Sequence, residues 1–344
     1  MKLFKITREG RTPSHIEIGT GLAARLAEFV PAGRPLFVVT DPHLAEAYAD
    51  LLAPYHKIVI GLGEENKTLA TVESIHTQLI EAGADRGCYL VGFGGGIVTD
   101  ITGFVASTYM RGVGFGFVAT SLLAQVDASV GGKNGVNLGG YKNMVGVFNQ
   151  PDFVLCDVGL LDTLPRREFV AGLAEVVKSA IIDDGELFEM LERTTVAELL
   201  ADKSLLTEVV ARTVAVKARI VAADEREGGV RRLLNLGHTV AHAIEKCSRE
   251  FVHGEAVAIG MRYIGEAALR AGVTDEATVS RICALLQGLE MPTECDIPMS
   301  QLTAALRKDK KGSGASIHVV FPCAIGRCEV QTMLYTTLDN YLKY

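Results

Sequence analysis

From about residue 35 to residue 157, short apolar runs alternate with segments of helical period. Five runs are apolar almost throughout and end in or near Gly, Thr or Asp: PLFVVTD, HKIVIGL, CYLVGFGGG, GFGFVAT and DFVLCDV. Such runs are typical of parallel strands buried on both faces. Segments such as TLATVESIHTQLIEAG lie between several of them and carry apolar residues at helical spacing. The alternation predicts a Rossmann-like α/β domain with a mostly parallel sheet, which would bind ligands at the carboxyl ends of its strands.

After about residue 160 the strand pattern nearly disappears. Apolar residues then recur at helical spacing in REFVAGLAEVVKSAIID, LTEVVARTVAVKARIVAADE, HTVAHAIEKC and GEAVAIGMRYIGEAALRAG, and only SIHVVFP reads as extended. We therefore expect two domains, an α/β nucleotide-binding domain over residues 1–157 and an all-α domain over residues 158–344. A cleft between two such domains is where small ligands most often bind.

Composition narrows the class of protein. The chain has 344 residues and a formal net charge of -7, which argues against a nucleic-acid binder that relies on bulk attraction to phosphate. It has no apolar run long enough for a membrane span, and its first residues are too charged for a signal peptide. Seven scattered cysteines without a C-x-x-C pair favour reduced thiols in a cytoplasm.

A glycine-rich turn follows one predicted strand in LVGFGGGIVTD, residues 90–100. Glycines at a strand-to-helix turn let the backbone approach a pyrophosphate, whose charge the helix N-terminus favours. The turn departs from the G-x-G-x-x-G dinucleotide fingerprint, because Ile97 stands where the last glycine should be. A purely structural turn is therefore an equal interpretation. Asp100 could bind a cofactor from the first helical turn or could cap that helix.

Two further segments combine small residues with cations. Lys133 follows a Gly-Gly pair in TSLLAQVDASVGGKNGVN, and Lys142 and Asn143 lie in YKNMVGVFNQP, which reads as a glycine-rich loop. Small residues around fixed cations leave room for a phosphate and neutralise its charge. The alternative is a flexible surface loop with solvated lysines.

A carboxylate and histidines in the second half suggest a metal site. Glu175 lies inside AGLAEVVKSA, an otherwise apolar helix, so a buried carboxylate there needs a metal or a cationic partner. Lys178, three residues further on, offers an ordinary ion pair on the same helix face. His238 and His253 each open a predicted helix, and two imidazoles with a carboxylate are a common catalytic zinc set.

His242 complicates this interpretation, because residues four apart share one helix face and the spacing would pair it with His238. Thr239 excludes the H-E-x-x-H metalloprotease motif. Further polar residues lie in the preceding stretch, VKARIVAADEREGGVRRLLNLGHT: Lys217, Arg231, Arg232 and Asn235. They could belong to the same site, or to a surface helix whose cations are balanced by the acids at 224, 225 and 227.

Taken together, these stretches resemble the 3-dehydroquinate synthase family of the sugar phosphate cyclases. The matching segments span roughly residues 92 to 261 in the family's order: GGGIVTDITGFVASTYMRG, TSLLAQVDASVGGKNGVN, KNMVGVFNQP, LDTLPRREFVAGLAEVVK, ADEREGGVRRLLNLGHTVAHAIE and HGEAVAIGM. The set is far more specific than any one of its motifs.

The resemblance implies that the histidines have different roles. Glu175, His238 and His253 would hold a catalytic zinc ion, which cobalt could replace, whereas His242 would help to hold the substrate phosphate. The other residues implied in binding substrate anions are Lys133, Asn143, Asn235, Lys310 and Arg111. In the homodimer that the family usually forms, Arg111 could come from the neighbouring subunit.

The remaining implied roles concern the reacting end of the substrate and the cofactor. Arg231 and Lys217 would face the carboxylate and hydroxyl groups, and Lys178 and Asp127 would line the reacting carbons. NAD would lie against a larger set: Asp41, Glu64, Lys67, Gly95, Gly96, Ile97, Asp100, Thr120, Ser121, Leu123, Lys142 and Thr163.

The implied reaction converts 3-deoxy-D-arabino-heptulosonate 7-phosphate to 3-dehydroquinate and phosphate within the shikimate pathway of aromatic amino acid biosynthesis. Zinc would acidify a substrate hydroxyl and favour its oxidation by NAD. Phosphate elimination, return of the hydride and an intramolecular aldol closure would follow, so NAD would be regenerated in each turnover. Cations would pair with the carboxylate and the phosphate of the substrate.

Several positions depart from the family pattern. His43 stands where asparagine is common beside the cofactor, and NLGGYKN, with Gly139 and Tyr141, replaces the usual approach to Lys142. Ala241 replaces a common glycine and His318 a common arginine. None of these changes removes a predicted metal ligand or a principal cation.

Three rival functions differ in chemistry. A sibling cyclase would act on sedoheptulose 7-phosphate or glucose 6-phosphate, but Arg231, Asn235 and His242 resemble the pattern for a carboxylate substrate. A metal-dependent polyol dehydrogenase would release reduced cofactor and would have little use for the lysines and Arg231 together. A non-catalytic binding protein would not need all three metal ligands.

Overall fold

The computed structural model describes residues 1–8, 11–308 and 316–343. By internal contacts the chain divides into two compact units, Met1–Leu164 and Pro165–Tyr344. The domain boundary predicted near Val158 falls in the last helical segment of the first unit, the 3-10 helix Val158–Thr163. The two units are described separately below.

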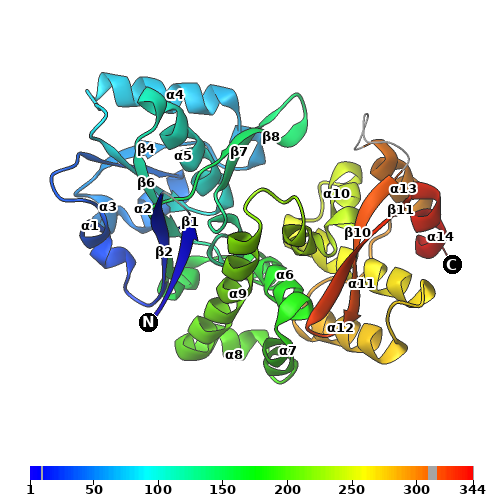
Figure 1. The fold of residues 1–344 in the computed structure, drawn as a ribbon. Coiled ribbons are helices and arrows are strands. Elements are labelled where there is room, and N and C mark those ends of the chain that lie inside the picture. Colours follow the sequence, from blue (N-terminus) through cyan, green and yellow to red (C-terminus); the bar gives the residue numbers. More distant parts are fainter. Residues whose placement is uncertain (9–10, 309–315, 344) are drawn as a thin grey trace. The chain divides into compact units, whose positions relative to one another are not determined.

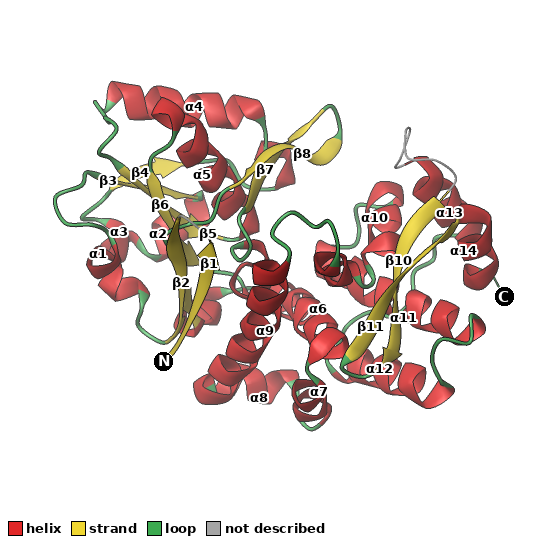
Figure 2. Cartoon of the chain, in the orientation of Figure 1, coloured by secondary structure: helices red, strands yellow, loops and turns green. Residues whose placement is uncertain are grey.

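The first unit is built on a parallel sheet (Figures 1 and 2). Over the described residues this sheet has seven strands in the order β1-β2-β9-β6-β5-β3-β4. The five predicted strands are all present and mutually parallel: β3 (Leu36–Thr40), β4 (His56–Val59), β5 (Tyr89–Gly94), β6 (Gly114–Ala119) and β9 (Phe153–Asp157). Val38, Val91 and Leu155 are fully buried in its core, as the apolar runs require.

An antiparallel hairpin at one edge of this sheet was not predicted. It consists of β1 (Lys2–Arg8) and β2 (Arg11–Gly19), and β2 pairs in parallel with β9. In β2 the buried residues Ser14, Ile16 and Ile18 alternate with more exposed neighbours. This two-residue period is the strand signal, but a serine and a proline within the segment conceal it.

The α-helices of the first unit are α1 (Leu26–Phe29), α2 (Pro42–Ala47), α3 (Ala49–Leu52), α4 (Leu69–Glu81) and α5 (Gly96–Thr108). That list covers the described residues. α5 follows β5 directly and packs on β5 and β6. Its first turn therefore begins at the carboxyl edge of the sheet, where a helix N-terminus favours negative charge.

The segment read as a glycine-rich loop forms a second hairpin, so that expectation was wrong. β7 (Lys133–Leu138) pairs antiparallel with β8 (Tyr141–Phe148), and Leu138 lies opposite Tyr141. The two residues between them, Gly139 and Gly140, both have positive φ, 59° and 82°. Positive φ at both central positions suits the tight turns that join antiparallel strands, and glycine adopts it without strain.

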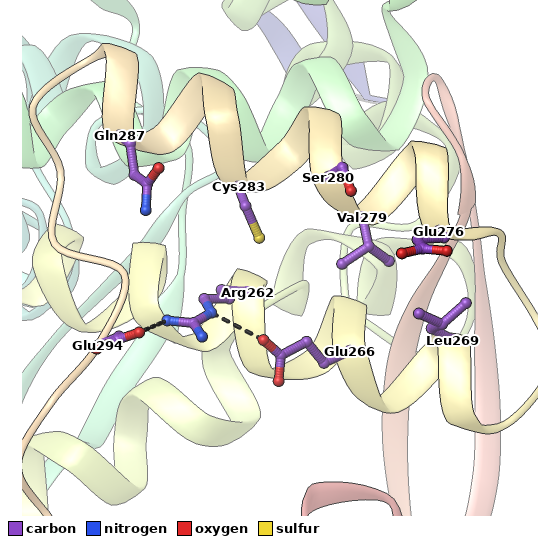
Figure 3. A pocket seen from close by; sticks show the side chains of 9 residues that line it. All are labelled: Arg262, Glu266, Leu269, Glu276, Val279, Ser280, Cys283, Gln287 and Glu294. Atoms are coloured by element: carbon purple, nitrogen blue, oxygen red, sulfur yellow. Dashed lines mark hydrogen bonds and ion pairs between the residues drawn. The ribbon is translucent and has the colours of Figure 1, made fainter.

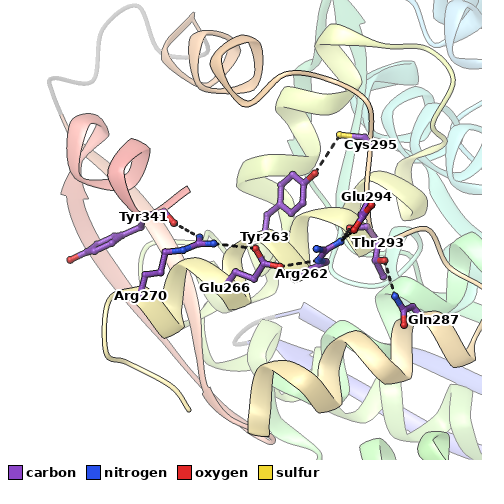
Figure 4. A network of polar contacts seen from close by, with 9 residues as sticks. All are labelled: Arg262, Tyr263, Glu266, Arg270, Gln287, Thr293, Glu294, Cys295 and Tyr341. Atoms are coloured by element: carbon purple, nitrogen blue, oxygen red, sulfur yellow. Dashed lines mark hydrogen bonds and ion pairs between the residues drawn. The ribbon is translucent and has the colours of Figure 1, made fainter. Parts of the chain in front are cut away.

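The second unit is mainly helical, as predicted. Its helices in the described ranges are α6 (Arg166–Asp183), α7 (Gly185–Glu192), α8 (Val196–Ala201), α9 (Lys203–Ala223), α10 (His238–Cys247), α11 (His253–Arg270), α12 (Glu276–Gly288), α13 (Met299–Lys308) and α14 (Tyr335–Leu342). A charged network ties α11 to its surroundings (Figure 4): Glu266 binds Arg262 and Arg270, and Arg270 donates to the backbone oxygen of Tyr341.

The second unit also contains a hairpin, which corrects the all-helical expectation in detail. β10 (Ser316–Ala324) includes the predicted extended segment, and it pairs antiparallel with β11 (Arg327–Leu334). β11 was missed because its sequence, RCEVQTML, is only partly buried and contains no β-branched run.

The junction between α6 and α7 depends on Asp184, which makes two kinds of contact. Its carboxylate accepts the backbone N–H of Leu187 at 3.0 Å and so caps α7. It also binds Arg212 of α9 at 2.6 Å and 2.9 Å. Partial burial opposes ionisation, but the bonds from Arg212 and Leu187 outweigh it and hold the pKa of Asp184 below its ordinary value.

We expect Asp184→Ala to lower the free energy of unfolding by about 1–3 kcal/mol at pH 7, because it removes a helix cap and a partly buried ion pair. A lowered folded-state pKa means that this stabilisation is present near neutral pH and is lost as pH falls through that pKa, below about pH 4. Urea unfolding followed by circular dichroism at pH 7 and at acidic pH measures both effects. Asp202→Ala removes an exposed cap of α9 and should cost only about 1 kcal/mol; equal losses for the two variants would contradict the role of Arg212.

Candidate metal centre and predicted ligand residues

Three helices of the second unit approach one another through glycines. A Cβ atom at Gly254 of α11 would lie 1.9 Å from the backbone oxygen of Ala171 in α6, and one at Gly260 would lie 2.1 Å from the backbone oxygen of Gly237. Gly237, which precedes α10, has φ +79°. Side chains at these positions would push α6, α10 and α11 apart. The glycines thus allow Glu175, His238 and His253, one on each helix, to meet.

The three predicted metal ligands lie together. The Nε2 atoms of His238 and His253 are 3.7 Å and 3.6 Å from the same oxygen, Oε1 of Glu175. One ligand atom from each residue lies within 4.8 Å of the others. A carboxylate with two imidazoles is the donor set of many catalytic zinc sites, and it leaves coordination positions open. The residues therefore fit a divalent metal.

Hydrogen bonds on the far side of each imidazole direct its Nε2 toward this group. Nδ1 of His238 lies 3.1 Å from the backbone oxygen of Leu236, and Nδ1 of His253 lies 3.4 Å from Oε1 of Glu245. Both acceptors require a proton on Nδ1, which leaves Nε2 as the atom able to bind a metal. Neither Leu236 nor Glu245 was singled out from the sequence.

The surroundings of the two histidines shift their pKa values in opposite directions. Burial and the nearby charge of Lys178 lower the pKa of His238 to about 3, so this ring is neutral near pH 7. Burial also opposes protonation of His253, but hydrogen bonds to Glu175 and Glu245 outweigh it and raise its pKa to about 9. A metal ion bound by both rings therefore displaces a proton from His253.

The ion pair anticipated as the alternative for Glu175 is also present. Nζ of Lys178 binds Oε2 of Glu175, and both side chains are almost completely buried. The histidines face the other oxygen, Oε1. The two interpretations are thus compatible, because the carboxylate uses one oxygen for the lysine and turns the other toward the imidazoles.

His242 lies beside this group without being part of it. Its ring is roughly perpendicular to that of His238, with 5.7 Å between centroids. Within the described ranges, the only group of His, Cys, Asp and Glu with ligand geometry is Glu175, His238 and His253. The pair that helical spacing alone would favour, His238 with His242, is therefore not the group found. The binding of substrate phosphate by His242 stays a prediction.

Three of the predicted cations of this unit are buried, which a surface helix would not require. Lys178, Lys217 and Arg231 are 2%, 7% and 2% exposed. Arg231 donates from its side chain to the backbone oxygen of Glu225, and its backbone N–H donates to Asp224 at 3.1 Å.

The carboxylates of Asp224 and Glu227, which the alternative interpretation treated as surface counter-charges, instead accept hydrogen bonds within this loop. The side chain of Asn235 belongs to the same loop, because its amide donates to Glu227 at 2.5 Å.

In the first unit, most residues predicted to bind the cofactor follow the carboxyl ends of parallel strands. They come after β3 (Asp41), β4 (Glu64, Lys67), β5 (Gly95, Gly96, Ile97, Asp100), β6 (Thr120, Ser121, Leu123) and β9 (Thr163). Lys142 is the exception, because it lies on β8. Because the strands are parallel, these ends share one edge of the sheet, which is where open α/β sheets bind ligands.

A polar network connects several of these residues. Nζ of Lys67 donates to Asp100 at 2.5 Å and to Oδ1 of Asn143 at 2.6 Å. Asn143 has φ +54°, and its backbone N–H donates to Oδ1 of Asn137 at 2.8 Å. Asn137 in turn donates to Glu64 at 2.8 Å. Asn137 begins NLGGYKN, the segment that departs from the family pattern, but the sequence assigned it no role of its own.

The position predicted for Asp100 was wrong. α5 begins at Gly96, which follows Gly95 as the N-cap, and its first turn contains no acidic residue. Asp100 lies one turn further in and pairs with Lys67, so it neither caps the helix nor belongs to the first turn. Gly95 and Gly96 also serve packing, because a Cβ at Gly96 would lie 3.0 Å from Cβ of Ala128.

The other candidates in the first unit occupy irregular or exposed backbone. Asp127 lies in a π-helical turn, Ala124–Ala128, a geometry often found at functional sites. Arg111 is exposed and has φ +71°. Lys133 and Lys142 are exposed on the β7–β8 hairpin. Lys310 lies outside the described residues.

A surface groove of about 360 Å³ lies along α11 and α12 (Figure 3). Arg262 in this groove is bound by Glu266 at 2.9 Å and by Glu294 at 2.6 Å. No residue predicted as a ligand lines it. The groove is therefore a separate feature, with its arginine engaged by its own glutamates.

Comparison with known proteins identifies the family. Two family models match in succession, 3-dehydroquinate synthase N-terminal over residues 57–171 and 3-dehydroquinate synthase C-terminal over residues 172–312. The 3-dehydroquinate synthase of Acidithiobacillus ferrooxidans is 42% identical over 92% of this chain and 91% of its own. That of Alkaliphilus metalliredigens is 38% identical over 94% and 96%. This chain belongs to the 3-dehydroquinate synthase family.

Solved structures related to the 3-dehydroquinate synthase family share this fold. A 2-epi-5-epi-valiolone synthase from Streptomyces hygroscopicus subsp. jinggangensis, with NAD+ and Zn2+ bound, is 26% identical and has a TM-score of 0.86, with 98% of each chain covered. A 2-deoxy-scyllo-inosose synthase complexed with carbaglucose-6-phosphate, NAD+ and Co2+ is 24% identical, with a TM-score of 0.88 and 99% of each chain covered. The predicted fold class is thus confirmed.

Two further findings concern the whole chain. None of the helices in the described ranges combines the length and apolarity that crossing a bilayer requires. All seven cysteines lie in the described ranges as free thiols.

We expect His238→Ala and His242→Ala to differ in metal binding. His238→Ala removes a ligand and should weaken Zn²⁺ affinity by more than about 100-fold, beyond the usual cost of an outer-sphere change. His242→Ala, which alters a neighbouring residue on the same helix, should keep the wild-type affinity. Competition with a chromogenic chelator measures both constants, and equal weakening in the two variants would contradict the division between the histidines.

The glycine contacts make a second prediction. Gly260→Ala places a methyl group 2.1 Å from the backbone oxygen of Gly237, so the helices must separate. We expect a loss of at least about 2 kcal/mol in unfolding free energy, together with weaker metal binding. Gly288→Ala is the matched control, because nothing lies within 4 Å of its added Cβ. It should be neutral or slightly stabilising in the same denaturant titration; a similar loss there would show that the effect is not one of close packing.

Proposed function

We propose that this chain is a 3-dehydroquinate synthase that converts 3-deoxy-D-arabino-heptulosonate 7-phosphate to 3-dehydroquinate and phosphate. Relatives of this name match nearly its whole length at 38–42% identity. The structural observation that carries the proposal is the Glu175 carboxylate, with Lys178 on one oxygen and His238 and His253 facing the other. This arrangement suits a Lewis-acidic metal beside a fixed cation.

The cofactors of the proposed reaction are NAD and Zn²⁺ or Co²⁺. Glu175, His238 and His253 would hold the metal ion. When bound, the metal would acidify a substrate hydroxyl, and NAD would accept a hydride and return it. The start of α5 after Gly95 and the network of Lys67 with Asp100 are suited to the phosphates and ribose of NAD, because both lie at the carboxyl edge of the sheet.

The chain's own side chains would bind and orient the substrate anions. Lys217 and Arg231, which are buried, would pair with the carboxylate, since charge-assisted bonds are strongest out of water. Lys178 and Asp127 would lie beside the reacting carbons. Phosphate would be held by the remaining predicted residues: Lys133, Asn143, Asn235, His242, Lys310 and Arg111.

We also propose that the enzyme works as a homodimer in the cytoplasm. Apolar side chains on the β7–β8 hairpin are unusually exposed, with Leu138 at 49%, Tyr141 at 54% and Met144 at 61%. A second copy of the chain would cover them. Arg111, exposed after α5, would then reach the phosphate of the neighbouring subunit. The free thiols of the cysteines are consistent with a reducing compartment.

A substrate panel tests the proposed reaction. Protein supplied with Zn²⁺ and NAD should release phosphate from the heptulosonate phosphate continuously, with no NADH beyond the enzyme's own concentration, because NAD is regenerated in each turnover. A phosphate assay and absorbance at the NADH band measure the two products. Turnover of only sedoheptulose 7-phosphate or glucose 6-phosphate would favour a sibling cyclase. Steady accumulation of NADH would indicate a polyol dehydrogenase.

A further inference from the structure

His253 is held between two carboxylates from different helices. Its Nε2 lies 3.6 Å from Oε1 of Glu175 in α6, and its Nδ1 lies 3.4 Å from Oε1 of Glu245 in α10. His253 is the first residue of α11 and its side chain is 31% exposed. Because the ring is partly exposed at a helix start, these two contacts help to fix its orientation.

Glu245 is nearly buried, and burying a carboxylate costs free energy of solvation. Its side chain is only 9% exposed, although glutamate is rarely buried without a compensating interaction. It follows His238 by seven residues on α10, which places both on one face of the helix, two turns apart. The same face of α10 therefore carries one predicted metal ligand and the carboxylate that contacts another.

The two histidines are supported by different acceptors. His238 uses the backbone oxygen of Leu236, which is neutral. His253 uses a carboxylate, which carries a negative charge. A carboxylate behind a metal-binding imidazole fixes its tautomer and makes the ring a better electron donor, and removing such a partner typically weakens metal affinity by about 10–100-fold.

We propose that Glu245 is a positioning residue of the metal centre, which accepts the Nδ1 proton of His253 and thereby keeps Nε2 turned toward Glu175 and the metal. The inference rests on the proposed metal site. It adds a residue that would act through a ligand rather than bind the metal itself. Helix α10 would then supply both a ligand, His238, and the carboxylate that orients His253.

Metal affinity tests this role directly. Glu245→Ala, which removes the acceptor, should weaken Zn²⁺ binding by about 10–100-fold in a chelator competition. Glu245→Gln keeps an acceptor oxygen without the charge, so its affinity should lie between wild type and Glu245→Ala. The visible spectrum of the Co²⁺-loaded protein should change in Glu245→Ala, because a reoriented His253 alters the coordination geometry. A residue needed only for folding would not produce this order or this spectral change.

The controls separate the inference from the metal site itself. Glu266→Gln removes a carboxylate from α11 that is bound to arginines, and it should leave the affinity at the wild-type value. Unfolding midpoints of the metal-free variants identify any that are misfolded. Wild-type affinity in Glu245→Ala, with metal lost in His253→Ala and Glu175→Ala, would overturn the role of Glu245 alone. Metal retained in His253→Ala and Glu175→Ala would overturn the site.

Discussion

The burial of one carboxylate constrains the second unit. Glu175 is about 1% exposed inside an apolar helix, and an ionised carboxylate there is stable only if cations or hydrogen-bond donors surround it. Lys178 on the same helix supplies one such group, and His253 on α11 supplies another. Because His253 comes from a different helix, its share of this compensation exists only in the folded arrangement. The stability of the buried charge on Glu175 therefore depends in part on how α11 packs against α6.

That arrangement also depends on glycines, which have no side chain. Gly254 and Gly260 let α11 touch the backbones of α6 and of the turn before α10, and larger residues would hold the imidazoles away from the carboxylate. The orientation of each ring is then set by a further contact, from Leu236 or Glu245. The site thus depends on the ligands themselves, on the close packing of three helices and on the hydrogen bonds that orient the rings.

The sequence correctly predicted the elements whose pattern of apolar residues is contained within the element itself. The apolar runs predicted β3, β5, β6 and β9 as buried parallel strands, and helical spacing predicted the elements around Glu175 and His238. The strands β2 and β11 were missed, because they alternate less and more exposed residues over short stretches containing polar side chains. The β7–β8 hairpin was read as a loop because its glycines suggested flexibility, whereas Gly139 and Gly140 form its turn.

For the candidate site, residue types and the family resemblance identified the metal ligands, but helical spacing alone favoured His238 with His242, and His242 is not part of the ligand group. Whether His238 groups with His242 or with His253 depends on how α10 meets α11, which no local pattern encodes. The roles of Asn137 and Glu245 were not recognised for the same reason, since each depends on a close contact with a residue from another element. Asp100 was expected to cap the helix or to lie in its first turn. The helix begins at Gly96, so Asp100 lies beyond the first turn.

The contact between Lys67 and Asp100 has a consequence for how sequences of this kind can diverge. Lys67 is 5% exposed and its ammonium donates to the carboxylate of Asp100 at 2.5 Å, so each group neutralises the other away from bulk water. Loss of one partner would remove the counter-charge of the other, a greater penalty than losing both. Drift at either position is therefore tolerated only when the two change together, and the pair should be inherited as a unit.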